Sequence, residues 1–394
     1  MTRPDYAGGG FANLMASIVE ACGGAPRHAP LARLLPAELA AAKNVLLLIV
    51  DGLGDNYLVR EGAGGALASR RRGAITSVFP STTASAITTS YTGWTPLEHD
   101  GRVVGVVARL LETAGWFTLF GEAGCVGSPL PFQRRGAKAA LGVAPGRLYR
   151  AGPLFDGLAR RSIVVSYRPI IDSTYNLHHC GRAERRAYDT LGGLVDQTAA
   201  ALKMGSDPIF AYAYWPEFDA LSHRHGNGSA EARAHFKAVD AAFGELMARL
   251  AGTDTLVVAT ADHGFIDSTG ADALEFADAP GLAGLLRYPL CGESRAAFCH
   301  VQEGRVREFQ QRAAGWLGAR ARVCESRELL EEGWFGPGDA HPRFAERIGD
   351  VALLMHGTAT VKDWVAGEPR HRHVGHHGGA SADEMLIPLI VGSA

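Results

Sequence analysis

The chain has 394 residues, of which 47% are hydrophobic and 20% charged, and its formal net charge is -2. This length allows one large domain or a core domain with a cap, and the composition is that of an ordinary globular protein. A net charge so close to zero gives no bulk attraction to nucleic acids or membrane surfaces, so we expect neither as a partner.

The N-terminus and the cysteines favour a cytoplasmic location. The first residues lack a basic segment followed by a long apolar core, which argues against a signal peptide. No apolar run approaches the ~20 residues that a transmembrane helix needs. The six cysteines are scattered and form no CxxC pair, which favours reduced thiols over disulfides.

Apolar runs alternate with amphipathic segments along the chain. Strands are predicted at residues 44–50, 116–120, 163–166, 209–214, 255–260, 297–301 and 351–355, followed by a final apolar run. Helices are predicted at 11–21, 83–91 and 229–250, the last with Ser229 as its N-cap. This alternation predicts an α/β sandwich with a mostly parallel sheet. Residues 121–200 and 271–350 lack a clear period, and we expect them to be cap inserts in a single domain of residues 1–394.

Polar side chains follow several of the predicted strands. Asp51, Asp219, Asp262 and His263 all lie just after such strands, where open α/β sheets place ligand-binding residues. A carboxylate beside an imidazole suits Zn²⁺ or a similar ion. Asp219 and His223 are four residues apart, so one helical turn presents both to one ion. Each pattern alone is also typical of a capped turn.

Two further clusters complete the set of candidate residues. The segment GHHGG near the C-terminus offers one histidine to a metal, because the glycines leave the approach open. Ser81, Thr82 and Thr83 lie at the start of the predicted helix at 83–91, where they act either as N-caps or as a nucleophile that a metal activates. Together these residues predict two divalent sites ~3.5–4 Å apart, which suit in-line phosphoryl displacement.

The ordered motifs VDGLG, PSTT, DALSH, ADHG and GHHGG resemble the alkaline phosphatase superfamily, and most closely its type I phosphodiesterase/nucleotide pyrophosphatase branch. This resemblance implies a three-layer αβα sandwich with cap segments and two zinc ions. Asp51, Asp262 and His263 then match the ligands of one zinc. Asp219, His223 and His377 match those of the second, with His376 as the alternative to His377. Thr83 matches the nucleophile, which forms a covalent phosphothreonine, because Pro80 precedes it by three residues and Thr92-Gly93 follows it as in the family pattern.

The chain departs from the nucleotide pyrophosphatases at two positions. Ala84 replaces the aromatic residue that follows the nucleophile, and the stretch DGRVVGVV lacks the expected Asn, for which Arg102 is a candidate substitute. The resemblance implies hydrolysis of phosphodiester or pyrophosphate bonds in a small substrate, nucleotides among the candidates. The alternatives are a phosphomonoesterase, a phosphonate hydrolase and a non-catalytic binding protein with the same fold.

Overall fold

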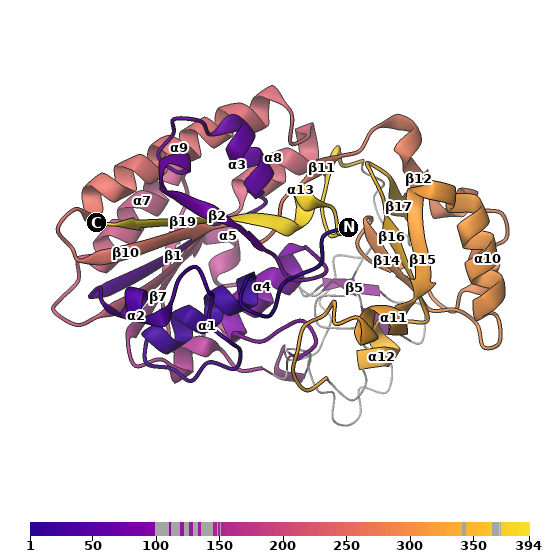
Figure 1. The fold of residues 1–394 in the computed structure, drawn as a ribbon, viewed down its shortest axis with the longest axis horizontal. Coiled ribbons are helices and arrows are strands. Elements are labelled where there is room, and N and C mark those ends of the chain that lie inside the picture. The colour runs from indigo at the N-terminus through magenta and orange to yellow at the C-terminus, as the bar shows by residue number, and fades with distance from the viewer. Residues whose placement is uncertain are drawn as a thin grey trace.

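A seven-stranded sheet forms the centre of the computed structural model (Figure 1). Its strands, in spatial order, are β2 (Arg71–Thr76), β19 (Leu386–Ser393), β10 (Thr255–Thr260), β1 (Asn44–Val50), β9 (Ile209–Trp215), β7 (Arg161–Tyr167) and β8 (Glu184–Tyr188). Neighbouring strands are parallel, except that β19 is antiparallel to both β10 and β2. The mostly parallel sheet predicted from the sequence is confirmed.

The structure describes residues 1–98, 151–340, 344–364, 370 and 372–394, together with 110–111, 119–121, 126–128, 133–134, 145–147 and 149. The short segments include a four-stranded antiparallel sheet of β3 (Leu110–Leu111), β4 (Leu119–Gly121), β5 (Val126–Ser128) and β6 (Gln133–Arg134). The strand predicted at 116–120 coincides with β4 at residues 119 and 120. Arg102 lies outside the described residues.

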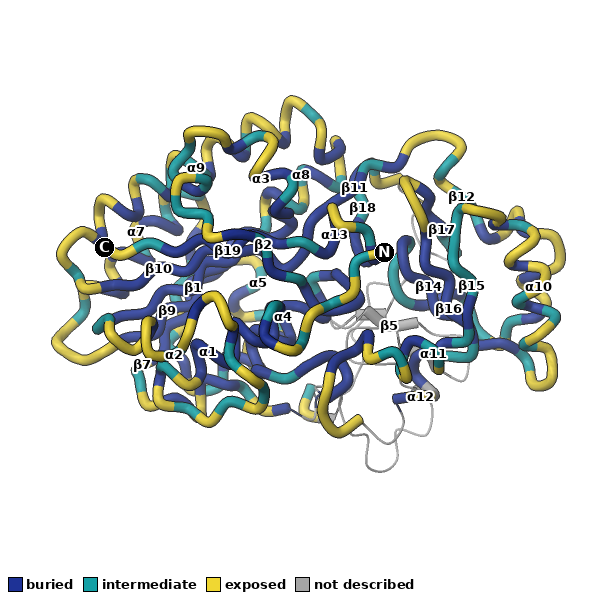
Figure 2. Tube along the Cα trace, in the orientation of Figure 1, coloured by how far each residue is buried: buried dark blue, intermediate teal, exposed yellow. Residues whose placement is uncertain are grey.

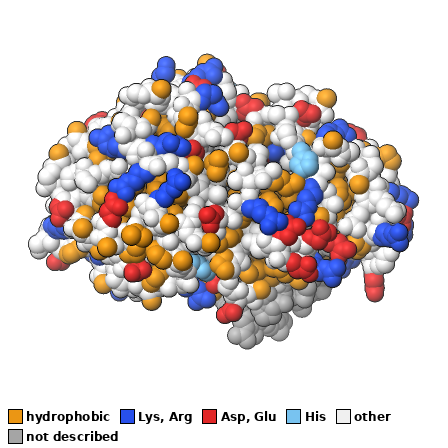
Figure 3. Space-filling view, viewed as in Figure 1, with side chains coloured by type: hydrophobic (Ala, Val, Ile, Leu, Met, Phe, Trp, Pro, Cys, Tyr) orange, Lys and Arg blue, Asp and Glu red, His pale blue; other side chains and the backbone are white. Residues whose placement is uncertain are grey.

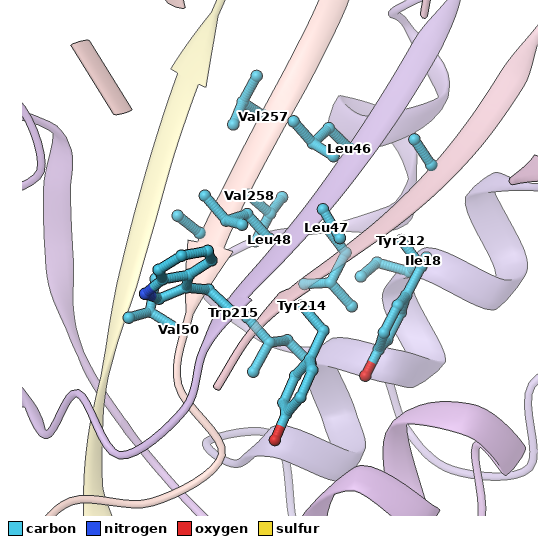
Figure 4. Packing of buried hydrophobic residues seen from close by; sticks show 14 of the residues in the cluster. Ile18, Leu46, Leu47, Leu48, Val50, Tyr212, Tyr214, Trp215, Val257 and Val258 are labelled. Carbon is cyan, nitrogen blue, oxygen red and sulfur yellow. The ribbon is translucent and has the colours of Figure 1, made fainter. Parts of the chain in front are cut away.

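The central strands are buried along their whole length, as their continuous apolar sequences predict (Figure 2). Leu47 of β1 pairs in register with Tyr212 of β9 and Val258 of β10, and these side chains pack together (Figure 4). Tyr212 and Tyr214 alternate along β9, so their hydroxyls point to the same face of the sheet (Figure 4). That face carries the hydroxyl-rich helix α4 (Thr83–Thr92), whose Ser90 side chain lies 2.8 Å from the Tyr212 hydroxyl.

Helices cover both faces of the sheet and complete three layers (Figure 1). One face carries α3 (Asp55–Glu61), α7 (Leu191–Leu202), α8 (Glu217–His225) and α9 (Ala230–Leu250), and the other carries α1 (Phe11–Ala21), α2 (Pro36–Ala40) and α4. Short helices α5 (Arg168–Ile171), α6 (Thr174–His179) and α13 (Ala382–Met385) lie in connecting segments. Ser229 caps α9 as predicted, since its hydroxyl accepts the Ala232 amide at 3.0 Å. The three-layer αβα sandwich is confirmed.

A second, smaller sheet lies beside the carboxyl ends of the main strands (Figure 1). Its strands are β13 (Cys291–Gly292), β14 (Ala296–Cys299), β16 (Val351–Met355) and β15 (Ala321–Glu325), all antiparallel, with helices α10 (Val306–Leu317), α11 (Ser326–Glu331) and α12 (Phe344–Arg347). Two ribbons join this region to the core: β11 (Ile266–Asp267) with β18 (Gly375–His376), and β12 (Ala273–Glu275) with β17 (Thr360–Lys362). We call the second sheet with α10, α11 and α12 the cap.

The division of the chain differs in one respect from the sequence interpretation. Residues 121–200 are expected in a cap insert, but β7, β8 and most of α7, which fall in this range, belong to the main sheet and its helical layer. The edge strand β8 has the sequence ERRAY, and its charged side chains conceal it from a search for apolar runs. For the remaining parts of 121–200 and 271–350, the division into core and cap stays a prediction.

The charges on the surface and the character of the helices complete the description of the fold. On the face shown in Figure 3, acidic and basic side chains are interspersed. Among the described helices, none combines the length and the apolar character needed to cross a membrane.

Candidate active site

The loop after β1 and the loop after β10 meet through a shared carboxylate. Asp262 Oδ1 accepts hydrogen bonds from the amides of Gly52, at 3.0 Å, and His263, at 3.1 Å. Gly52 has φ +77°, and a Cβ there would come within 2.5 Å of the Phe265 ring. The Asp-Gly sequence at residues 51–52 therefore allows the two loops to approach closely.

The first cluster consists of Asp51, Asp262 and His263, all of them buried. His263 Nε2 lies 3.4 Å from Asp51 Oδ1 and 3.4 Å from Asp262 Oδ2. Within the described part of the chain, these two carboxylate oxygens have no hydrogen-bond partner. Three donor atoms from the ends of two adjacent strands thus converge on one point.

The second cluster consists of Asp219, His223 and His377. Asp219 and His223 lie one turn apart on α8, and Asp219 Oδ1 is 3.5 Å from His223 Nε2. His377 Nε2 reaches the same point from the loop after β18, at 3.1 Å from His223 Nε2 and 3.8 Å from Asp219 Oδ1. Asp219 Oδ1 is also 4.0 Å from His263 Nε2, so the two clusters adjoin.

The structure separates the two adjacent histidines of the GHHGG segment. His376 turns away from the clusters, with its Nδ1 3.0 Å from Ser294 Oγ and its Nε2 3.1 Å from the His373 carbonyl. His377 points into the second cluster instead. His377 is therefore the member of the pair placed with the other candidate ligands.

The electrostatics of the clusters fit divalent cations. Burial, with the carboxylates of Asp262 and Asp219, raises the pKa of Asp51 well above its usual range. Burial also raises the pKa of Asp219, opposed by His263 and reinforced by Asp262. Burial and the neighbouring imidazoles lower the pKa of His377. Three buried carboxylate oxygens of the clusters, one each on Asp51, Asp219 and Asp262, have no hydrogen-bond partner among the described residues. Burying such oxygens without a partner costs free energy, and a bound cation would offset that cost.

Thr83 is the hydroxyl of its segment that faces the clusters. It is the first residue of α4, and its Oγ1 lies 3.1 Å from His263 Nε2. Ser81 donates instead to the Gly379 carbonyl at 2.8 Å, and Thr82 donates to Glu293 Oε1 at 2.8 Å. The two neighbouring hydroxyls are thus engaged elsewhere. Thr83 also stands at the helix end where free N–H groups favour an anion.

Residues 163–380, more than half of the chain, match the type I phosphodiesterase / nucleotide pyrophosphatase family. The chain belongs to this family. Membership places it among the phosphoric-ester hydrolases, and the matched range contains the motifs DALSH, ADHG and GHHGG. No curated protein matches the chain.

Solved structures with the same fold include two kinds of enzyme. Murine ectonucleotide pyrophosphatase / phosphodiesterase 5 has 18% identity and a TM-score of 0.62, with 88% of this chain and 87% of that chain covered. An inactive form of that protein has been solved in complex with AMP. Phosphonoacetate hydrolase from Sinorhizobium meliloti 1021, in complex with phosphonoformate, has 17% identity and a TM-score of 0.59, with 89% and 90% covered.

A tyrosine beside the first cluster of this phosphodiesterase-family chain escaped the sequence analysis. The Tyr214 hydroxyl donates a hydrogen bond to Asp51 Oδ2, which leaves Oδ1 directed at the cluster. Tyr214 lies two residues after Tyr212 in the run IFAYAY, so alternation along a buried strand could have indicated that both hydroxyls share a face. Nothing in the sequence indicated that the face was that of Asp51.

A buried ion pair organises the loop that carries His377. Arg295 of the cap and Glu384 of α13 are both fully buried, and two hydrogen bonds of 3.1 and 2.9 Å join them. Glu384 also accepts the Gly379 amide at 2.8 Å and the Ser381 hydroxyl at 2.7 Å. This pair therefore fixes the residues that follow His377.

The position after the candidate nucleophile differs from the one expected of a nucleotide-binding site. Ala84 is buried and packs in an apolar cluster that includes Phe79, Leu97 and Ala380. An alanine in this setting provides no aromatic face for a base. Arg102, the candidate phosphate ligand, lies outside the described residues.

Proposed function

We propose that the chain is a two-zinc hydrolase that cleaves phosphodiester or pyrophosphate bonds through a covalent phosphothreonine at Thr83. The observation that carries this proposal is the position of the Thr83 hydroxyl, 3.1 Å from His263 Nε2, where the buried first cluster adjoins the partly exposed second cluster. A hydroxyl beside two sets of acidic and imidazole ligands is the arrangement that a metal-assisted nucleophile needs.

The residues present fit two zinc ions. Asp51, Asp262 and His263 would hold one, and Asp219, His223 and His377 would hold the other. Bound zinc would supply positive charge that lowers the pKa of a hydroxyl or water and stabilises developing negative charge on oxygen.

The proposed reaction has two steps, and Thr83 forms a covalent bond to phosphorus in the first. The Thr83 hydroxyl releases its proton to solvent and its Oγ1 attacks phosphorus. An Oγ1–P bond forms while the bond from phosphorus to the leaving oxygen breaks, and that oxygen departs as an anion or takes a proton from water. The first amides of α4 face the phosphoryl oxygens at the helix N-terminus. A water then attacks the phosphothreonine from the side that the leaving group has vacated, which releases phosphate or its monoester and restores the Thr83 hydroxyl.

The substrate is a small phosphate-containing molecule. Nucleotides are candidates because the related murine structure holds AMP, and phosphonates are candidates because phosphonoacetate hydrolase shares the fold. A non-catalytic binding protein is disfavoured because all six proposed ligands and the threonine are present in the two clusters.

The test is hydrolysis of bis-para-nitrophenyl phosphate, the para-nitrophenyl ester of thymidine monophosphate and para-nitrophenyl phosphate, each with zinc present. A preference for the diesters supports the proposal, and a preference for the monoester overturns it. Thr83→Ala is expected to lower kcat by roughly a thousandfold or more while zinc content persists. Thr82→Ala removes the neighbouring hydroxyl and serves as the matched control, which keeps turnover within about tenfold of the unsubstituted chain. Retained activity in Thr83→Ala contradicts the assignment of the nucleophile.

A further inference from the structure

A hairpin of the cap reaches both loops of the candidate active site. The turn between β13 and β14 carries Glu293 and Ser294, and Arg295 follows at its end. Ser294 contacts His376, and Arg295 binds Glu384 and the Ala359 carbonyl. These contacts fix the hairpin against the loop of His377. Glu293 lies beside them in the same turn, and it belongs neither to the proposed zinc ligands nor to the residues of the proposed phosphoryl transfer.

Three observations locate the Glu293 carboxylate. Its Oε1 accepts the hydroxyl of Thr82, the residue directly before the proposed nucleophile, at 2.8 Å. Its stem lies against Gly378, directly after His377, where a Cβ at the glycine would come within 2.4 Å of the Glu293 Cβ. Its charge also reaches Asp219 of the second cluster, where it contributes to raising the pKa of that carboxyl. Glu293 therefore borders the space between Thr83 and the second cluster.

The contact with Thr82 places the Glu293 carboxylate at the N-terminal end of α4. Thr82 is the N-cap of α4, but its hydroxyl makes no capping bond to the helix. It donates to Glu293 instead, so a carboxylate stands at the helix end where a phosphoryl group would bind. A fixed negative charge at this position opposes additional negative charge on the ligand.

We propose that Glu293 is a specificity residue that makes the site discriminate against phosphoryl groups carrying two negative charges, and so selects diesters over monoesters. The proposal rests on the proposed function, because it takes the Thr83 site as the place where the phosphoryl group binds. A diester carries one negative charge at neutral pH, whereas a monoester carries close to two. The extra charge of the monoester meets the Glu293 carboxylate in a partly desolvated site, where repulsion is stronger than in water.

A binding measurement tests this selectivity without turnover. Thr83→Ala protein loaded with zinc is titrated calorimetrically with para-nitrophenyl phosphate and with bis-para-nitrophenyl phosphate at pH about 8, where the monoester is dianionic. Glu293→Gln, which keeps an oxygen to accept the Thr82 hydroxyl, is added to this background. We expect the affinity for the monoester to rise about tenfold relative to that for the diester.

Two control variants separate charge from structure. Glu293→Asp keeps the charge and is expected to hold the affinity ratio within about threefold of the parent. Glu303→Gln removes a carboxylate that is exposed in the turn before α10 and is expected to leave the ratio unchanged. An unchanged ratio in Glu293→Gln, or an equal loss of affinity for both esters, overturns the proposal.

The proposed function fails in a different way. If the unsubstituted chain with zinc hydrolyses none of the nitrophenyl esters, the proposed reaction is wrong. The calorimetric ratio still shows whether Glu293 excludes the dianion from the site.

Discussion

The buried pair of Arg295 and Glu384 allows a prediction whose magnitude follows from the structure. Glu384→Gln keeps the shape of the side chain but removes its charge and one of its two acceptor oxygens. The Arg295 guanidinium, which is fully buried, then remains charged without the carboxylate that pairs with it in the structure. Breaking a buried pair by neutralising one partner costs about 3–5 kcal/mol. This is a large part of the ~5–15 kcal/mol that typically stabilises a folded domain.

The assay is urea unfolding followed by circular dichroism, with a double-mutant cycle. Glu384→Gln and Arg295→Met should each lower the free energy of unfolding by about 3–5 kcal/mol. The double variant should cost less than the sum by about 2 kcal/mol, because neither partner is then left as an isolated charge. Glu308→Gln in the exposed pair with Arg305 is the control and should cost less than about 1 kcal/mol. If Glu384→Gln lowers the free energy of unfolding by no more than Glu308→Gln does, the pair of Arg295 and Glu384 does not stabilise the fold as argued.

Two further predictions concern the metal clusters. His377→Ala should lower the zinc content, measured by mass spectrometry of the metal, from about two ions per chain to about one. His376→Ala should leave both ions in place, because His376 faces Ser294. Equal losses of zinc in the two variants would contradict the placement of His377. Tyr214→Phe should weaken zinc binding or turnover about 10–100-fold by releasing Asp51, whereas Tyr212→Phe, whose hydroxyl contacts Ser90, should leave both close to those of the unsubstituted chain.

The elements predicted best are those whose sequence carries a strong period or a continuous apolar run. The strand at 44–50 and the helix beginning after Ser229 agree with the structure because burial on both faces and a 3.6-residue period each leave an unambiguous pattern. The strand β8 was missed because an edge strand keeps its charged side chains in water. Apolar runs and periods in a sequence therefore indicate which segments are buried, and they do not indicate which backbones pair in a sheet.

The proposed ligands were predictable for a similar reason. Acids and histidines at the carboxyl ends of parallel strands meet at one edge of the sheet, which predicted that several of them lie close together. Their assignment to two zinc sites came from the resemblance. The residue types alone left the choice between His376 and His377 open, because adjacent residues of the same type differ only in the direction of the backbone, and the resemblance favoured His377 with His376 as the alternative. The β18 pairing and the positive φ of Gly378 decide that direction.

The cap contributes residues beside the candidate site that the sequence analysis did not single out. Three of the proposed ligands follow the core strands β1 and β10 directly, whereas Glu293 and Arg295 come from a cap hairpin whose first strand, β13, has only two residues. Because this hairpin contacts the residue before Thr83 and the residue after His377, a change in the cap would reach both sides of the proposed phosphoryl site without altering a proposed ligand. Chains that share the five motifs can therefore differ in substrate through the cap alone. For this chain, the charge of Glu293 is the cap feature from which we infer a preference for diesters.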